Sequence, residues 1–98
     1  MADYILLMHG DTTDGADVSA WAPYLEKLRS AGSLRGGSAI GSGLCMRRDG
    51  TCPSITKHIV GFIRVEARDL DHAGDLLDGN PVFEAGGTVE IRELQRSD

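Results

Sequence analysis

Cysteine is scarce in this sequence, long apolar runs are missing, and basic residues are fewer than acidic ones. The 98 residues include two cysteines, Cys45 and Cys52, and only 5% are aromatic. An isolated pair without a secretory signal favours reduced thiols over a disulfide framework. The spacing matches no zinc pattern, so no metal site is expected. No run approaches the roughly 18 apolar residues of a membrane span.

The charge balance points away from nucleic acid. The net charge is −5, and the nearest basic cluster, Arg47-Arg48, stands beside Asp49-Gly50 as in a solvated hairpin tip. Met1–Met8 lacks the basic start of a signal peptide. No Gly-Lys-Ser/Thr follows Gly36-Gly37 as in a phosphate loop. We therefore expect a cytoplasmic protein with no cofactor, no nucleic-acid partner and no membrane partner.

Three segments have the apolar pattern of well-formed strands. Tyr4–Met8 is apolar at every position, which is typical of a strand buried on both faces. His58–Ala67 places Ile63 and Val65 on one face, and Val60, Phe62 and Arg64 on the other. The closing segment Gly79–Leu94 begins with a turn at Asn80-Pro81 and ends in an alternating strand. Ser33–Gly43 is glycine-rich and predicts a weaker strand at a sheet edge.

Two helices and a hairpin arm are expected between these strands. Val18, Trp21, Leu25 and Leu28 recur at helical spacing, and Gly32 ends that helix. Asp69 is a candidate N-cap for a second helix with an apolar stripe from Leu70 to Leu77. Leu44–Arg48 and Thr51–Thr56 predict a hairpin arm around Asp49-Gly50, a common type I′ pair.

The order of elements, β-α-β-β-α-β in a single domain over residues 1–98, predicts an α+β fold of the ferredoxin-like type. Two right-handed crossovers place both helices on one face of an antiparallel sheet, with the first and third strands central. The other face carries Val60 and Phe62 and would form an apolar patch if it were exposed to solvent. The simplest cover is a second copy of the chain, sheet against sheet, which makes a homodimer.

Three segments resemble the YCII-related proteins, including their DGPF-type branch: Tyr4–Asp11, Leu28–Gly37 and Asn80–Arg92, the last being the most specific. The resemblance spans nearly the whole chain and implies a dimeric α/β barrel with internal pockets. For a few members it implies dehydrochlorination or lactone-type chemistry on aromatic breakdown products. Enzymatic members have a His near the start of the first helix and an Asp before the Pro of the closing motif. Those places fall on Trp21 and Asn80, neither of which can act as an acid–base partner.

Other residues are candidates for chemistry or binding. His9 ends the first strand and is a candidate general base with Asp11 as its orienting carboxylate, and His58 could approach the same mouth. The expected ligand pocket contains Trp21, His58, Arg64, Asn80 and Arg92. Arg64 and Arg92 could bind an acidic ligand or pair with Glu90 instead. His72 is expected to face solvent.

Three hypotheses follow from these residues. The first is a small-molecule-binding dimeric barrel of the YCII-like type that lacks the His/Asp dyad. The second is a dehydrochlorinase-like or isomerase-like enzyme acting on a small aromatic or lactone-like acid through His9 and Asp11. The third is an interaction module. A pocket of several hundred Å³ favours the first two, and a barrel filled with side chains favours the third.

Overall fold

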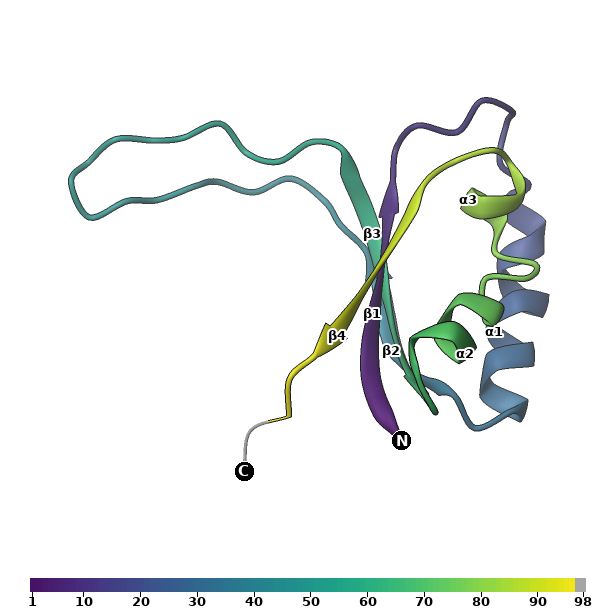
Figure 1. Ribbon diagram of the computed structural model, residues 1–98. Helices are drawn as coiled ribbons and strands as arrows, with labels where there is room; N and C mark the ends of the chain where they lie inside the picture. The colour runs from purple at the N-terminus through teal and green to yellow at the C-terminus, as the bar shows by residue number, and fades with distance from the viewer. Residues whose placement is uncertain (97–98) are drawn as a thin grey trace.

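A four-stranded antiparallel sheet with the helices on one side organises the chain in the computed structural model, which describes residues 1–96 (Figure 1). The strands are β1 (Ala2–His9), β2 (Leu34–Ala39), β3 (Ile59–Ala67) and β4 (Val89–Leu94). Their order in the sheet is β2-β3-β1-β4, so the first and third strands are central and the glycine-rich β2 is an edge. The predicted ferredoxin-like α+β fold is confirmed.

The helical layer is built from short elements with identifiable caps. It contains the 3₁₀ turn η1 (Val18–Ala20) and the helices α1 (Trp21–Ser30), α2 (Leu70–Asp75) and α3 (Pro81–Glu84). The Asp69 side chain accepts from the His72 backbone N–H at 2.8 Å, as the predicted N-cap requires. Gly32 follows α1 with a φ of 75°, a conformation that glycine adopts without strain.

Two expected stripe residues are not in the core, because they stand where their elements begin. Val18 is 79% exposed in η1, and Leu70 is 56% exposed at the first position of α2. The helix α3 was missed, since Asn80-Pro81 was interpreted only as a turn. Asn80 is its N-cap and Pro81 its first residue, a combination in which proline loses no helical hydrogen bond.

The core lies between the sheet and the helices. On β1, Tyr4, Leu6 and Met8 are buried while the residues between them are only half-buried. Leu28 of α1 and Val65 of β3 complete this layer at 1% and 0% exposure. The opposite face of the sheet, here called the open face, is not covered by any helix of the described residues (Figure 1).

The segment between β2 and β3, residues 40–58, projects from the open-face side as a long arm (Figure 1). Its limbs run back along one another, but the structure assigns no strand to them. The turn at the tip is not type I′ as predicted. Gly50 N–H donates to the Arg47 carbonyl at 3.1 Å, and Asp49 has no positive φ. Type I′ needs a positive φ at both central positions.

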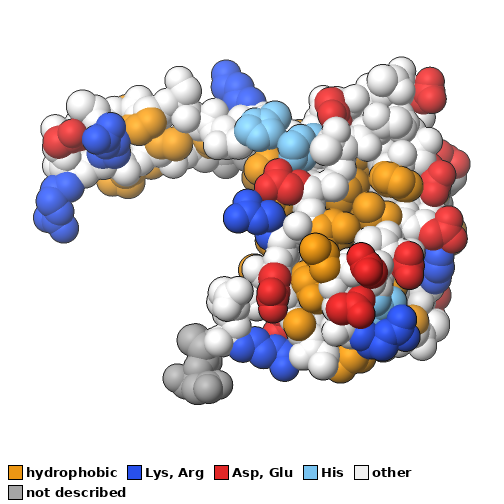
Figure 2. Space-filling model, in the orientation of Figure 1, with side chains coloured by type: hydrophobic (Ala, Val, Ile, Leu, Met, Phe, Trp, Pro, Cys, Tyr) orange, Lys and Arg blue, Asp and Glu red, His pale blue; other side chains and the backbone are white. Residues whose placement is uncertain are grey.

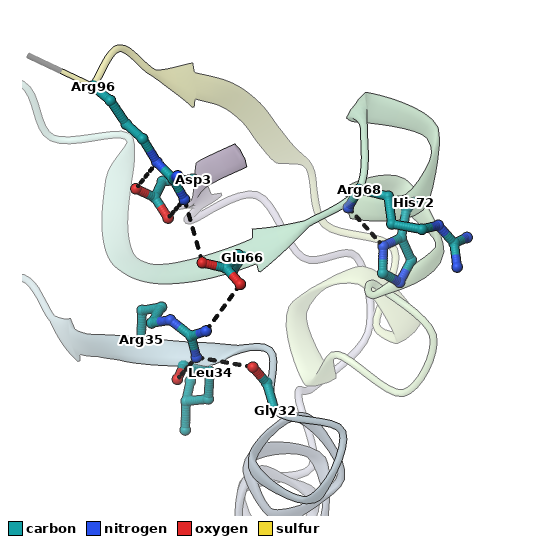
Figure 3. Close-up of polar contacts among 8 residues, drawn as sticks. All are labelled: Asp3, Gly32, Leu34, Arg35, Glu66, Arg68, His72 and Arg96. Carbon is teal, nitrogen blue, oxygen red and sulfur yellow. Dashed lines mark hydrogen bonds and ion pairs between the residues drawn. The ribbon is translucent and has the colours of Figure 1, made fainter. Parts of the chain in front are cut away.

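An ion network crosses the open face at the end of the sheet away from the arm (Figure 3). Arg96 binds Asp3 of β1 through two bonds, at 2.9 and 3.0 Å, and Glu66 of β3 at 3.3 Å. Glu66 also pairs with Arg35 of β2 at 3.1 Å. The same view shows His72, which is half-buried and whose Nδ1 accepts from the Arg68 backbone N–H at 3.0 Å.

Candidate functional site

A cavity of about 660 Å³ lies between α1 and the β2–β3 edge of the sheet. Helix α1 contributes Trp21, Leu25 and Arg29, which recur every four residues and so form one ridge of the helix. The volume of the cavity falls within the range of about 300–1,000 Å³ that is usual for ligand pockets. The remaining wall is largely apolar and comes from the strands, Met8 of β1 and Val82 of α3.

Several residues on the strand side of the cavity have small side chains or none. In the register of β2 against β3, Gly37 lies opposite Ile63 and Ala39 opposite Gly61. A Cβ at Gly61 would come within 3.1 Å of the Met8 Cε and 3.4 Å of the Ser38 carbonyl. A Cβ at Gly37 would come within 2.6 Å of the Phe62 carbonyl. Backbone and small side chains therefore form this part of the wall, and neighbouring atoms leave little room for a larger residue at either glycine.

Aromatic and charged groups lie at the α1 wall. The Trp21 ring meets Tyr24 edge-on, with centroids 6.2 Å apart and planes at 70°. Tyr24 is buried, and its hydroxyl donates to the Leu76 carbonyl at 2.7 Å. Arg29 lies at the rim with its side chain 62% exposed, paired with Glu26 at 2.6 Å. A flat ligand would thus meet an aromatic ring inside the cavity and a guanidinium group at its edge.

Asn80 has a structural role in this part of the molecule. It is fully buried, and its Oδ1 accepts from the backbone N–H groups of Val82 and Phe83 at 3.0 and 3.1 Å. Its Nδ2 has no hydrogen bond of acceptable geometry among the described residues. Burial raises the pKa of Tyr24, and the nearby Asn80 amide offsets this only in part. The Asn80 oxygen is committed to the α3 cap.

A second group of polar residues lies where the arm joins the sheet. This group, the histidine cluster, consists of His9, His58, Glu90 and Arg92. His9 Nε2 is 3.2 Å from Glu90 Oε1, and Arg92 Nη1 is 3.3 Å from Glu90 Oε2. The two imidazole rings meet edge-on with centroids 5.1 Å apart. Figure 2 shows histidine side chains in contact at the base of the arm, with an acidic and a basic side chain below. The hydrogen bonds from His9 and Arg92 lower the pKa of Glu90.

The geometry gives His9 and Asp11, the predicted pair, different hydrogen-bond partners. Asp11 accepts from the Thr88 backbone N–H at 2.8 Å and from the Thr88 hydroxyl at 2.6 Å. These bonds lower the pKa of Asp11 and tie the loop after β1 to the start of β4. The carboxylate that contacts His9 is Glu90. Among residues 1–96, Arg64 forms no ion pair with Glu90 or another acid, and its Nη2 donates to the Arg35 carbonyl at 2.9 Å.

The seven predicted site residues therefore do not share one pocket. Trp21 lines the cavity, while His9, His58 and Arg92 belong to the histidine cluster. Sequence reasoning missed Leu25 and Arg29 as pocket residues, although their spacing from Trp21 could have indicated them. Within residues 1–96 there is no group of three or more His, Cys, Asp or Glu side chains placed to hold a metal ion.

Comparison with protein families identifies the chain. The model of the YCII-related domain matches residues 6–97. The chain belongs to the YCII-related family. Among curated proteins, no sequence match is found for this YCII-related chain.

A solved structure shares its fold. This is 5-chloro-2-hydroxyhydroquinone dehydrochlorinase (TftG) from Burkholderia phenoliruptrix AC1100, in complex with 2,5-dihydroxybenzoquinone. The match has a TM-score of 0.54 and 16% sequence identity, and covers 99% of this chain and 96% of the other. At that identity the likeness concerns the fold.

No helix in the described part of this YCII-related chain has the length and apolar character needed to cross a bilayer.

Proposed function

We propose that this YCII-related protein is a homodimer that binds a small, flat, largely apolar molecule in the cavity between α1 and the β2–β3 edge. The observation that carries the proposal is the cavity of about 660 Å³ with Trp21 in its wall. An apolar pocket of this size with few polar groups is typical of a small-molecule site. The dehydrochlorinase of similar fold was solved with a quinone bound, which supports an aromatic or quinone-like ligand.

The places of the family's His/Asp dyad hold residues that do not transfer protons. The indole nitrogen of Trp21 is a donor only, and the amide of Asn80 does not titrate near neutral pH. Asn80 is further restrained because its oxygen caps α3. Binding without the dyad's acid–base chemistry is therefore the function that the cavity supports best.

The homodimer is supported by the composition of the open face. The alternation of β1 and β3 puts Ile5, Leu7 and Phe62 there, half-buried, and Val60, 41% exposed. Burying apolar surface is worth about 25 cal/mol per Å², so a second sheet over this face would contribute several kcal/mol. An identical sheet is complementary in character, which favours a face-to-face pair.

Trp21 is the single tryptophan of the chain and makes the proposal directly testable. Titration with 2,5-dihydroxybenzoquinone should quench its fluorescence saturably, with N-acetyltryptophanamide as the control for light absorption by the quinone. Ala39→Leu places a larger side chain in the cavity and should raise the dissociation constant about tenfold or more. Ala22→Leu, the same change on α1 outside the cavity lining, should leave it unchanged. Quenching that is linear, or equal in Ala39→Leu, would contradict a site in this cavity.

A second candidate function rests on the contact between His9 and Glu90. A histidine held by a carboxylate is the usual arrangement of a general base, and His58 lies beside it. On this alternative the protein is an enzyme acting on a small aromatic or lactone-like acid through His9, with Glu90 in the role first assigned to Asp11. Chloride release from 5-chloro-2-hydroxyhydroquinone should then stop in His9→Asn and continue in His72→Asn. Chloride release unaffected by His9→Asn would exclude it.

A further inference from the structure

Beyond its base, where His58 contacts His9 and Gly10, the arm projects away from the rest of the described chain (Figure 1). It comprises nineteen residues, because β2 ends at Ala39 and β3 begins at Ile59. Two of its apolar side chains, Leu44 and Met46, are 75% and 83% exposed. The molecule measures 46 × 41 × 19 Å with a radius of gyration of 14.9 Å, whereas a domain of this length usually has about 13 Å. An extended apolar segment of this kind indicates a surface that is covered by another molecule.

The length of the arm matches the thickness of a second copy. Each limb has seven or eight residues outside the Arg47–Gly50 turn, which at about 3.3 Å per residue reach about 25 Å. A second sheet packed on the open face lies about 10 Å away. Its helices, about 10–12 Å in diameter, then occupy the next layer, roughly 15–25 Å from the first sheet. The arm points to the open-face side (Figure 1), so its tip would lie level with the partner's helices.

The charges of the arm and the body are complementary. Residues 40–58 contain Arg47, Arg48 and Lys57 against the single acid Asp49, a net charge of +2. The other 79 residues therefore carry −7 out of the total of −5. The helical layer contains exposed acids, among them Asp71 and Asp75 of α2. The tip itself carries Arg47 and Arg48 against Asp49, which lies 3.7 Å from Arg47. Its excess of positive charge is favourable beside an acidic helical surface, and each copy of this chain supplies both.

From this length, exposure and charge, we propose that the arm of each copy crosses the flank of the partner's sheet and lays its basic tip on the partner's acidic helical layer. This clasp rests on the homodimer proposed above, and it assigns the interface to the arm as well as to the open face. The exposed Leu44 and Met46 lie against the partner, and Arg47 and Arg48 approach its acids. The partner is therefore a second copy of this chain.

Dissociation of the dimer gives the first test. The wild type should sediment at twice the 10.5 kDa of one chain. Leu44→Glu combined with Met46→Glu should raise the dimer dissociation constant about tenfold or more. Arg47→Glu with Arg48→Glu should raise it by a smaller factor that shrinks at high salt. Val18→Glu, an equally exposed apolar residue outside the arm, should have no effect. A dimer as tight in both arm variants as in the wild type would overturn the clasp.

Contact between copies gives the second test, by nuclear magnetic resonance. A nitroxide is attached to Cys52 in a Cys45→Ser chain, which is mixed with an isotope-labelled, unmodified Cys45→Ser, Cys52→Ser chain. We expect line broadening in the isotope-labelled copy at Asp71, Asp75 and other acids of its helical layer, lost on reduction of the nitroxide. If the sample is dimeric and the broadening is confined to the arm of the isotope-labelled copy, the clasp is overturned and the proposed homodimer stands. A wild type of 10.5 kDa at micromolar concentration would overturn both, while the Trp21 titration would still report on the cavity.

Discussion

Leu6 and Leu7 are neighbours on β1, yet they lie in two different environments. Leu6 points to the helices and is 0% exposed, whereas Leu7 points to the open face and is half-buried. The same contrast runs along β1 from Tyr4 to His9, because successive side chains of a strand point to opposite faces. An unbroken apolar run thus places apolar side chains on both faces of the sheet, and the described helices cover one of those faces. We propose that a second copy covers the other.

The chemistry of the two faces also differs. The helix side contains the cavity, with an aromatic wall and the buried Tyr24 and Asn80. The open face contains the histidine cluster at one end and the Asp3–Arg96 network at the other. The sheet therefore separates a cavity whose described lining has no Asp, Glu or His side chain from a cluster of two histidines, a carboxylate and an arginine. That separation favours binding over catalysis as the role of the cavity.

The largest expected effect distinguishes the two leucines. Leu6→Ala removes a fully buried side chain from the helix-side core and should lower the free energy of unfolding by about 2–5 kcal/mol. Leu7→Ala is the matched control, with the same change one residue along. Its effect should appear mainly as a weaker dimer, because in the proposed homodimer the partner covers the Leu7 side chain. Urea unfolding at several protein concentrations measures both.

Two outcomes would contradict this view of the sheet. Equal losses for the two variants, independent of protein concentration, would mean that Leu7 is as well packed within one chain as Leu6. A loss below about 1 kcal/mol for Leu6→Ala would mean that the helix-side core adapts to a cavity.

The sequence predicted the fold well because strand alternation and element order are local signals. The apolar run of β1, the alternation of β4 and the glycine-rich β2 each indicated their place in the sheet, and the edge position of β2 is confirmed. The helix α3 was missed because four residues are too few to show a periodicity. Its signal was Asn80 followed by Pro81, which is a helix start as well as a turn.

The site was less predictable because it depends on contacts between distant segments. Asp11 was paired with His9 for its closeness in sequence, but it binds Thr88, 77 residues away. Glu90 reaches His9 because β4 pairs with β1 in the sheet. The cavity is lined on its strand side by Gly37, Ala39 and Gly61, and these residues come together only through the register of β2 against β3.

A smaller effect on the helix side is expected at Asn80. Asn80→Ala removes the cap of α3 and leaves the buried N–H of Val82 and the partly buried N–H of Phe83 without their acceptor. The free energy of unfolding should fall by about 1–3 kcal/mol. Asp69→Ala removes the exposed cap of α2 and should cost less, since water can replace the lost acceptor. Chemical denaturation of both variants measures the difference, and an Asp69→Ala loss equal to or above that of Asn80→Ala would contradict the role of burial.

The smallest expected effect is a pH dependence of stability, and it comes from the Asp3–Arg96 pair on the open face. The hydrogen bonds from Arg96 lower the pKa of Asp3 from its ordinary value of 3.8. Because the folded-state pKa is the lower one, the contribution of Asp3 to stability is present in full above 3.8 and is lost as pH falls through the lowered pKa. Asp3→Asn should therefore shift the urea midpoint slightly at neutral pH, and the difference from wild type should vanish in acid. It should also shrink in high salt, since the pair is exposed. The deficit of Leu6→Ala should stay constant over the same pH range, because no charge is involved. A deficit of Asp3→Asn that persists unchanged in acid would show that the variant loses packing rather than an ion pair, and that the two faces do not differ in this way.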